Sequence, residues 1–313
     1  METIVHIHDQ PMPPVRDSGG SNRLAHWLAT EQSIQGDTVY AMTRGGSATE
    51  HYDHIELPKT LEFHSLCRLI PSDTTGIEIH GGLPLATAIK LLKEVPHAIN
   101  IVHAGHGVGI KDVFVSKSHA NAASKATYAY NGIPTDDYVY SARKEDWLLF
   151  LAKVKRSKKG VDSAIRICKR TRQPLIIAGG KKLSCPETWF RWHPLISPVG
   201  YINGPEKYEL LSQAKALVVP IRWEEPFGLT VIEAMISGTP VIAFRRGAMS
   251  ELIVDGVTGL LCDDEEEMVD AIGKVHTLNP KDCREHVLRR FTSKHMYEKH
   301  AELLTMARSG LSW

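Results

Sequence analysis

Short apolar runs alternate with segments of helical periodicity along the whole chain. The first apolar run, Thr3–His8, leads through a glycine loop into residues 22–32, where Leu24, Ala25 and Leu28 recur at helical spacing. The order of strand, loop and helix then repeats, with strands expected at 38–42, 77–82, 99–107 and 111–115 and helices expected at 85–95 and up to 124. Alternation of this kind predicts a parallel sheet with helices on both faces.

The same rhythm begins again at Trp147. The expected strands are 147–154, 174–180, 216–221, 240–244 and 258–262, and the expected helices are 161–171, 206–214, 250–254 and 265–275. The chain is therefore expected to be an α/β protein with two doubly wound, Rossmann-like parallel-sheet domains and a cleft between them.

The two patterns meet near residues 131–137, which sets the expected domain limits. We expect an N-terminal domain at 1–140 and a C-terminal domain at 141–292. The last segment, 293–313, contains a helical pattern without a strand to pair with, so it is a candidate for packing across the domain junction.

Composition narrows the classes of function. The 313 residues carry a net charge of +1, with 37 Lys+Arg against 36 Asp+Glu, and the C-terminal part is only mildly basic. That balance is too weak for a nucleic-acid-binding face but suits one compact anionic ligand. Five cysteines without metal or disulfide spacing, and no apolar run of membrane-spanning length, favour a cytoplasmic protein without a transmembrane segment; peripheral membrane contact stays open.

The stretch WEEPFGLTVIEAMISG (223–238) carries the clearest chemistry. It follows an expected strand, bends at Pro-Phe-Gly, and begins a helix whose first amides can seat a phosphate near Gly228. Glu225 and Glu233 stand on either side of that position, where each can accept hydrogen bonds from sugar or ribose hydroxyls. The alternative is that Glu225 lies near the helix dipole and Glu233 is solvated.

A basic loop at 151–160 offers cations for the same phosphate. Lys153 and Lys159 are the expected contacts, although basic runs are commonly solvated surfaces. In the N-terminal domain, Gly19 and Gly20 precede a helix and let backbone approach a ligand, unless they serve only a turn.

Eleven of the 16 histidines lie in residues 1–140. His80, His103 and His106 follow expected strand ends, and His106 is the preferred candidate to orient a hydroxyl, with His103 open to a structural role. The glycines at 105–109 lack the context of a dinucleotide fingerprint. The acidic run at 263–267 resembles a metal site only in charge and is better explained as a first helical turn.

The block EPFGLTVIEAMISGTPVIAFRRGAMSELIVDGVTGLL strongly resembles the donor site of the retaining glycosyltransferases of family 4, whose Glu-x7-Glu pattern falls on Glu225 and Glu233. NGIP (131–134), the segment ending in KGVD (147–162), LIIAGG and VGYINGPEKYELL follow in the family's order. The resemblance spans nearly the whole chain and is closest to the small antibiotic- and envelope-type members. The family's usual Gly-Arg before the basic loop appears here as Ala152-Lys153.

This resemblance implies a GT-B fold and transfer of a sugar, with retention, from a UDP- or GDP-sugar to a hydroxyl of a carbohydrate, lipid-linked or small-molecule acceptor. It implies no metal or other cofactor, because basic side chains and helix amides stabilise the leaving diphosphate. The implied catalytic residues are His106, Lys159 and Glu225. The implied donor contacts are Gly19, Gly20, Lys153, Lys159, Glu225, Phe227, Gly228, Leu229, Thr230 and Glu233.

Two other functions fit parts of the pattern. A nucleotide-sugar-binding protein without catalysis is suggested by Lys153 in place of the family arginine and by the short N-terminal domain. A sugar-nucleotide epimerase of similar architecture would interconvert donors without an acceptor, but the PFGLTVIEAM block is more specific to transferases.

Overall fold

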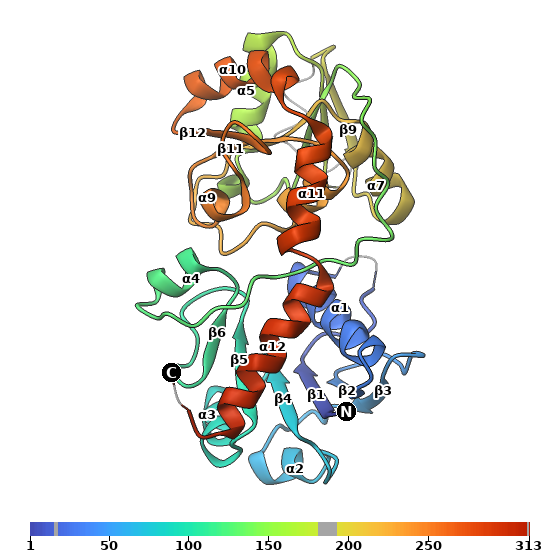
Figure 1. The fold of residues 1–313 in the computed structure, drawn as a ribbon, viewed down its shortest axis with the longest axis vertical. Coiled ribbons are helices and arrows are strands. Elements are labelled where there is room, and N and C mark those ends of the chain that lie inside the picture. The colour runs from blue at the N-terminus through green and yellow to red at the C-terminus, as the bar shows by residue number, and fades with distance from the viewer. Residues whose placement is uncertain (16–17, 181–192, 312) are drawn as a thin grey trace. The chain divides into compact units, whose positions relative to one another are not determined.

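The computed structural model describes residues 1–15, 18–180, 193–311 and 313. The chain forms two compact units, the first made of Met1–Pro134 and Thr292–Trp313 and the second of Thr135–Phe291. The helix after residue 292 is therefore part of the first unit. Figure 1 shows both units as ribbons coloured along the chain.

The first unit is built on a sheet of six parallel strands in the order β3-β2-β1-β4-β5-β6. The strands are β1 (Thr3–His8), β2 (Thr38–Thr43), β3 (Asp53–Glu56), β4 (Gly76–Ile79), β5 (Ala98–Val102) and β6 (Asp112–Phe114). The helices are α1 (Gly20–Ile34), α2 (Phe63–Cys67), α3 (Leu85–Glu94), α4 (Lys117–Ala122) and α12 (Ser293–Arg308).

Helices α1 and α12 pack together, and α12 also contacts β5, as the ribbon shows. Leu303 and Leu304 of α12 join Ile4 and Ile99 in one apolar cluster. At the start of α12, Ser293 donates its backbone N–H to the carbonyl of Ile133, which lies at the end of the first segment of the same unit. The central strands β1, β4 and β5 are buried on both faces, as is typical of a covered parallel sheet.

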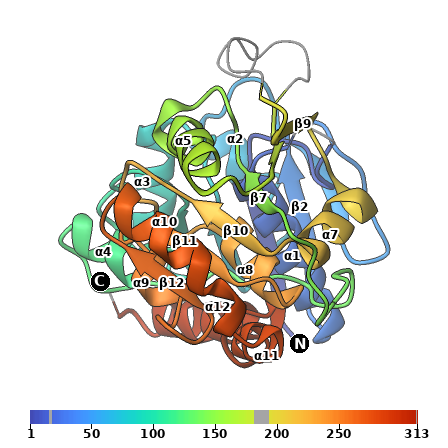
Figure 2. The ribbon, with the colours of Figure 1, turned by 90° about the horizontal axis from the view of Figure 1, so that it is seen from above.

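The second unit has the same architecture, with six parallel strands in the order β12-β11-β10-β7-β8-β9. The strands are β7 (Leu148–Leu151), β8 (Leu175–Ala178), β9 (Ile196–Gly200), β10 (Ala216–Val219), β11 (Val241–Phe244) and β12 (Gly259–Cys262). The helices are η1 (Ser157–Lys159), α5 (Val161–Thr171), α7 (Gly204–Gln213), α8 (Leu229–Ile236), α9 (Met249–Leu252), α10 (Glu265–Lys274), η2 (Val275–Thr277) and α11 (Pro280–Arg290). In Figure 2 the neighbouring strands β7, β10 and β11 are seen from above.

The expected fold class is confirmed: two Rossmann-like units, each with a parallel sheet. Among the strands and α-helices of the described residues, β3, α2, β9 and α11 were not predicted. Three of these elements are short. In addition, β9 contains Pro198, and proline is uncommon inside strands because it has no backbone N–H to donate. Helix α11 is dominated by charged side chains and buries only Cys283, His286 and Val287, so its apolar periodicity is weak.

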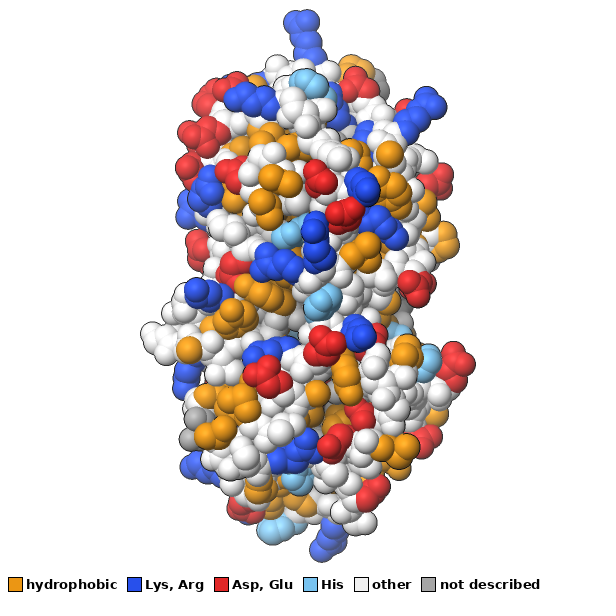
Figure 3. Space-filling view, in the orientation of Figure 1, with side chains coloured by type: hydrophobic (Ala, Val, Ile, Leu, Met, Phe, Trp, Pro, Cys, Tyr) orange, Lys and Arg blue, Asp and Glu red, His pale blue; other side chains and the backbone are white. Residues whose placement is uncertain are grey.

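Charges of both signs share the face of the molecule drawn in Figure 3. On the face drawn in Figure 3, basic and acidic side chains are interspersed on both units rather than gathered by sign. No helix in the described part of the chain is both long and apolar enough to cross a bilayer.

Candidate functional site

The strand order of the second unit marks one place for a ligand. The chain starts at β7 and winds outward through β8 and β9, then returns to β10 and winds the other way. In such sheets ligands bind beyond the carboxyl ends of the two central strands, where the order reverses. A pocket lies at this switch point, lined by the ends of β7 and β10 and by Lys159, Glu225, Gly228 and Thr230.

Lys159 and Glu225 face each other in the pocket. Lys159 donates from Nζ to Glu225 Oε2 over 2.5 Å, and the Trp223 indole Nε1 donates to the same oxygen over 2.8 Å. The two charged side chains are 20% and 12% exposed, so a ligand can still reach them. Lys158 adds a second cation, with its Nζ 3.2 Å from the centroid of a Trp223 ring.

Gly160 brings two loops of this site together. Gly160 has φ +80°, and a Cβ there would lie 1.8 Å from the carbonyl oxygen of Pro220, so only glycine permits this approach. Arg222 also donates its backbone N–H to the carbonyl of Lys158. The basic loop is thereby held against the chain that leaves β10, which explains how Lys159 meets Glu225.

Gly228 stands at the entrance to α8. It caps the helix with φ +108° and without a side-chain cap, and it lines the pocket together with Thr230 and Val231. The positive end of the α8 dipole therefore adjoins the pocket that Lys159 lines. An anion in this pocket would meet both.

Glu233 occupies a different environment from Glu225. It is fully buried in α8, where Oε1 accepts hydrogen bonds from Tyr138 Oη at 2.9 Å and Lys207 Nζ at 2.8 Å. Lys207 is itself only 7% exposed, so the two form a buried ion pair. Glu233 does not line the pocket, and the solvated alternative weighed for it is wrong.

The other predicted donor contacts fall into two groups. Gly228 and Thr230 line the pocket, whereas Phe227 is 3% exposed and packs edge-on against Phe291 at 6.1 Å. Leu229 is half-buried at the first position of α8 and does not line the pocket. Of the two predicted lysines, Lys159 lines the pocket and Lys153 is exposed outside it.

The predicted residues of the N-terminal part belong to the first unit. Gly19 is the N-terminal cap of α1 and Gly20 its first residue, while residues 16–17 of the same loop lie outside the described residues. His106 is exposed in the loop after β5. His80 and His103 are instead bonded to each other, Nδ1 to Nε2 at 3.1 Å.

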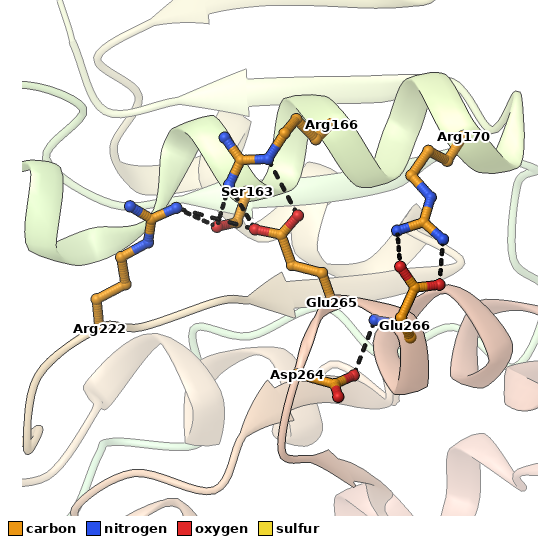
Figure 4. Close-up of polar contacts among 7 residues, drawn as sticks. All are labelled: Ser163, Arg166, Arg170, Arg222, Asp264, Glu265 and Glu266. Carbon is orange, nitrogen blue, oxygen red and sulfur yellow. Dashed lines mark hydrogen bonds and ion pairs between the residues drawn. The ribbon is translucent and has the colours of Figure 1, made fainter.

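The acidic run at 263–267 is a helix start, as predicted. Asp264 accepts hydrogen bonds from the backbone N–H groups of Glu266 and Glu267 at the beginning of α10. Figure 4 shows that Glu265 and Glu266 pair with Arg166 and Arg170 of α5. The hydrogen bond from Arg166 lowers the pKa of Glu265.

Arg222 connects this network to the pocket. Its guanidinium donates to Ser163 Oγ at 2.8 Å and lies 3.8 Å from Glu265 Oε1. Because Arg222 precedes Trp223, the ion pairs between α5 and α10 support the loop that carries Glu225. The role of Trp223 was not predicted from the sequence, although an indole donor two residues before a carboxylate could have indicated it.

Comparison with known proteins finds relatives of much of the second unit. Residues 145–277 match the family described as Glycosyl transferases group 1. Glycogen synthase from Mycobacterium tuberculosis is 30% identical over 155 residues, which cover 44% of this chain and 36% of that protein. The chain thus spans about a third of the length of the first curated relatives that it matches.

Solved structures extend the likeness to the whole chain. AviGT4, described as a glycosyltransferase involved in avilamycin A biosynthesis, superposes with a TM-score of 0.77 at 19% identity and covers 100% of both chains. Anabaena HepE, solved with UDP and glucose, gives a TM-score of 0.74 at 16% identity over 97% of this chain and 100% of its own. The fold is that of GT-B glycosyltransferases, and the predicted likeness to glycosyltransferases is confirmed for residues 145–277.

Proposed function

We propose that the protein is a retaining glycosyltransferase of family 4 that transfers a sugar from a UDP- or GDP-sugar to a hydroxyl group. The observation that carries this proposal is the meeting of Lys159, Glu225 and the α8 N-terminus in one pocket at the switch point of the second sheet. A diphosphate needs cations and amide donors, and the attached sugar needs acceptors for its hydroxyls.

Each group has a distinct task in the proposed reaction. Lys159 and the first amides of α8 stabilise the negative charge that grows on the diphosphate as the bond to the sugar breaks. Glu225 then accepts hydrogen bonds from sugar hydroxyls once the diphosphate has drawn Lys159 toward itself. Glu233 is assigned to the ribose by the family resemblance, which requires that a ligand reach past Lys207 and Tyr138.

The remaining predicted residues complete the proposal. His106 orients a hydroxyl from the first unit, and Gly19 and Gly20 let backbone approach the ligand. Lys153, Phe227 and Leu229 keep their assignment to the donor from the resemblance alone. No metal is needed for the transfer, because cationic side chains replace it at the diphosphate.

Different observations support the proposed donor and the proposed acceptor. UDP is favoured because HepE was solved with UDP and with UDP-glucose. A small-molecule acceptor is favoured because AviGT4 is described as involved in avilamycin A biosynthesis. A carbohydrate or lipid-linked acceptor is proposed from the family resemblance alone. We assign the reaction to the cytoplasm because the five cysteines show no disulfide spacing.

Two lysines of the same loop provide a matched test. Lys159→Ala should weaken binding of a UDP- or GDP-sugar and lower transfer or donor hydrolysis by about 10²- to 10³-fold, because one cation at the developing charge is lost. Lys153→Ala, which changes an exposed side chain outside the pocket, should have a much smaller effect. Thermal shift with a panel of UDP-, GDP-, ADP- and TDP-sugars measures binding, and product analysis measures turnover.

Several outcomes would contradict parts of the proposal. Equal losses in the two lysine variants would remove the assignment of Lys159 to the diphosphate. Donor binding without any turnover would favour the non-catalytic binder, and an epimerised donor formed without acceptor would favour the epimerase. Glu225→Ala that folds and keeps full activity would exclude its role, and activation by added Mg²⁺ or Mn²⁺ would exclude metal independence.

A further inference from the structure

Three potential metal ligands converge at the switch point of the first sheet, far in sequence from the residues of the second unit. His6 in β1 and Glu78 in β4 are direct partners in the parallel register, so both side chains leave the sheet on the same face. His80 follows the end of β4. The three residues are 0%, 0% and 6% exposed, and His6 Nδ1, Glu78 Oε2 and His80 Nε2 all lie within 4.8 Å of one another.

The spacing of these atoms fits a small tetrahedral site. His6 Nδ1 lies 2.9 Å from His80 Nε2 and 3.4 Å from Glu78 Oε2, and His80 Nε2 lies 3.9 Å from Glu78 Oε2. Bonds of about 2.0 to 2.2 Å to a tetrahedral zinc ion place its ligands roughly 3.3 Å apart. The observed distances bracket that value, so a metal requires only small side-chain shifts.

Each ligand is also fixed through its outer atom. His6 Nε2 bonds to Gln32 Oε1 of α1 at 2.5 Å, and His80 Nδ1 bonds to His103 Nε2 at 3.1 Å. Glu78 Oε1 accepts from His300 Nδ1 of α12 at 2.9 Å. Metal-binding histidines and carboxylates typically carry such outer hydrogen bonds, which set the tautomer and aim the ligand atom inward.

One of the three inner atoms has no hydrogen-bond partner. Glu78 Oε2 is shielded from solvent and has no hydrogen-bond donor. If His6 donates its Nε2–H to Gln32, its Nδ1 can accept from His80 Nε2 at 2.9 Å, and Glu78 Oε2, 3.4 Å from His6 Nδ1, is still without a donor. A buried carboxylate oxygen without a donor is costly, and a bound cation would satisfy it.

We propose that His6 Nδ1, His80 Nε2 and Glu78 Oε2 bind a zinc-class divalent metal ion in the first unit, with a fourth position left for water. Two imidazoles and one carboxylate are a donor set that suits Zn²⁺. The ion would join β1 and β4 to α1 and α12 through the outer hydrogen bonds.

This site is separate from the proposed transfer reaction, which uses residues of the second unit at the diphosphate. It departs from the expectation of no bound metal, which concerned donor binding. The alternative is a neutral, hydrogen-bonded histidine chain that holds no ion, and the experiment below decides between them.

The test uses the chain of residues 1–313 without a metal-affinity tag, stripped with a chelator and dialysed. Wild type should take up about one Zn²⁺ per chain, measured by elemental analysis, and should melt at a higher temperature with Zn²⁺ than without it. Co²⁺ in place of Zn²⁺ should give the visible absorption of a tetrahedral site.

Matched variants separate this site from the chain's other histidines. His80→Ala and Glu78→Gln should bind Zn²⁺ at least tenfold more weakly and lose the Co²⁺ spectrum, and His103→Ala should weaken binding about 10- to 100-fold. His26→Ala is the control, because His26 bonds to Tyr52 in the same unit and takes no part in the hydrogen bonds given above for the three ligands. If His80→Ala does not fold, Glu78→Gln and His103→Ala carry the test. No Zn²⁺ uptake by wild type, or equal uptake by wild type and the folded ligand variants, overturns the proposal.

Discussion

The two sheets share one strand order, yet their switch points hold opposite environments. Beyond β7 and β10 there is a pocket whose charged pair, Lys159 and Glu225, is still partly exposed. Beyond β1 and β4 the corresponding position is filled by buried histidines around Glu78. Strand order therefore fixes where ligands can gather, while the side chains at the strand ends decide whether the place is open to a substrate or closed around its own polar groups.

The difference begins in the strands themselves. β7 ends in Phe150 and Leu151, so the second sheet contributes apolar walls and leaves the chemistry to loops. In β1, Ile4, His6 and His8 lie on the same face of the sheet, so the first sheet carries polar side chains within the strand itself. Polar groups on loops can be reached by a ligand, whereas those inside a strand must find partners in the core.

The largest effect is expected from breaking the buried ion pair of the second unit. Lys207→Met removes the cation from Glu233 and leaves a buried carboxylate, which should lower the free energy of unfolding by about 3 to 5 kcal/mol. Urea denaturation measures the change. Such a loss would show that the stability of the second unit also depends on a buried charge, Glu233, which lies about one turn further along α8 than the residues that line the pocket.

The double variant Lys207→Met/Glu233→Gln is the control. It removes both charges, so it should recover a substantial part of the lost stability. A single Lys207→Met that unfolds like wild type would mean that the pair is open to water, and the contrast between Glu225 and Glu233 would then disappear.

The repeated strand and helix pattern allowed most of the fold to be predicted from the sequence. Parallel strands buried on both faces read as apolar runs, and the helices between them show their own period. Helix α11 was missed because charged residues dominate it, and α2 and β3 were missed because they are too short to show a period.

The sites were predictable only in part. Glu225, Gly228 and Lys159 were identified from residue type and from position after expected strands. Their meeting depends on the close approach of Gly160 to Pro220, which no local pattern reveals. The histidine cluster was missed because Glu78 and His300 are 222 residues apart, although the alternation of histidines in β1 was visible.

An intermediate effect is expected from His26, a histidine of the first unit outside the cluster. Burial, with a smaller contribution from His51, lowers the pKa of His26 to about 4. Its ordinary pKa in the unfolded chain is about 6.5, so below that pH the unfolded chain binds more protons. Stability should therefore fall as the pH drops from about 6.5 towards 4, by roughly 1 to 2 kcal/mol at pH 5.

His26→Leu removes this titration and is compared with wild type by urea denaturation at pH 7.5 and at pH 5. The difference in stability between the two proteins should shift in favour of the variant at the lower pH. An identical pH dependence in both would show that His26 is as accessible to protons as a surface side chain. Of His26 and the histidines around Glu78, only those around Glu78 would then be shielded from solvent in the first unit.

The smallest effect is expected from the ion pairs that support the open pocket from outside. Arg166→Ala removes the hydrogen bonds to Glu265 and Ser163 in the network of Figure 4. Because these side chains are partly exposed, the free energy of unfolding should fall by no more than about 1 kcal/mol, and less at high salt. Arg222 keeps its own bond to Ser163, so the loop before Glu225 should hold its place and donor binding should change little. A loss above about 2 kcal/mol would show that the second unit, like the first, is held at its switch point by a strongly coupled polar network rather than by its apolar core.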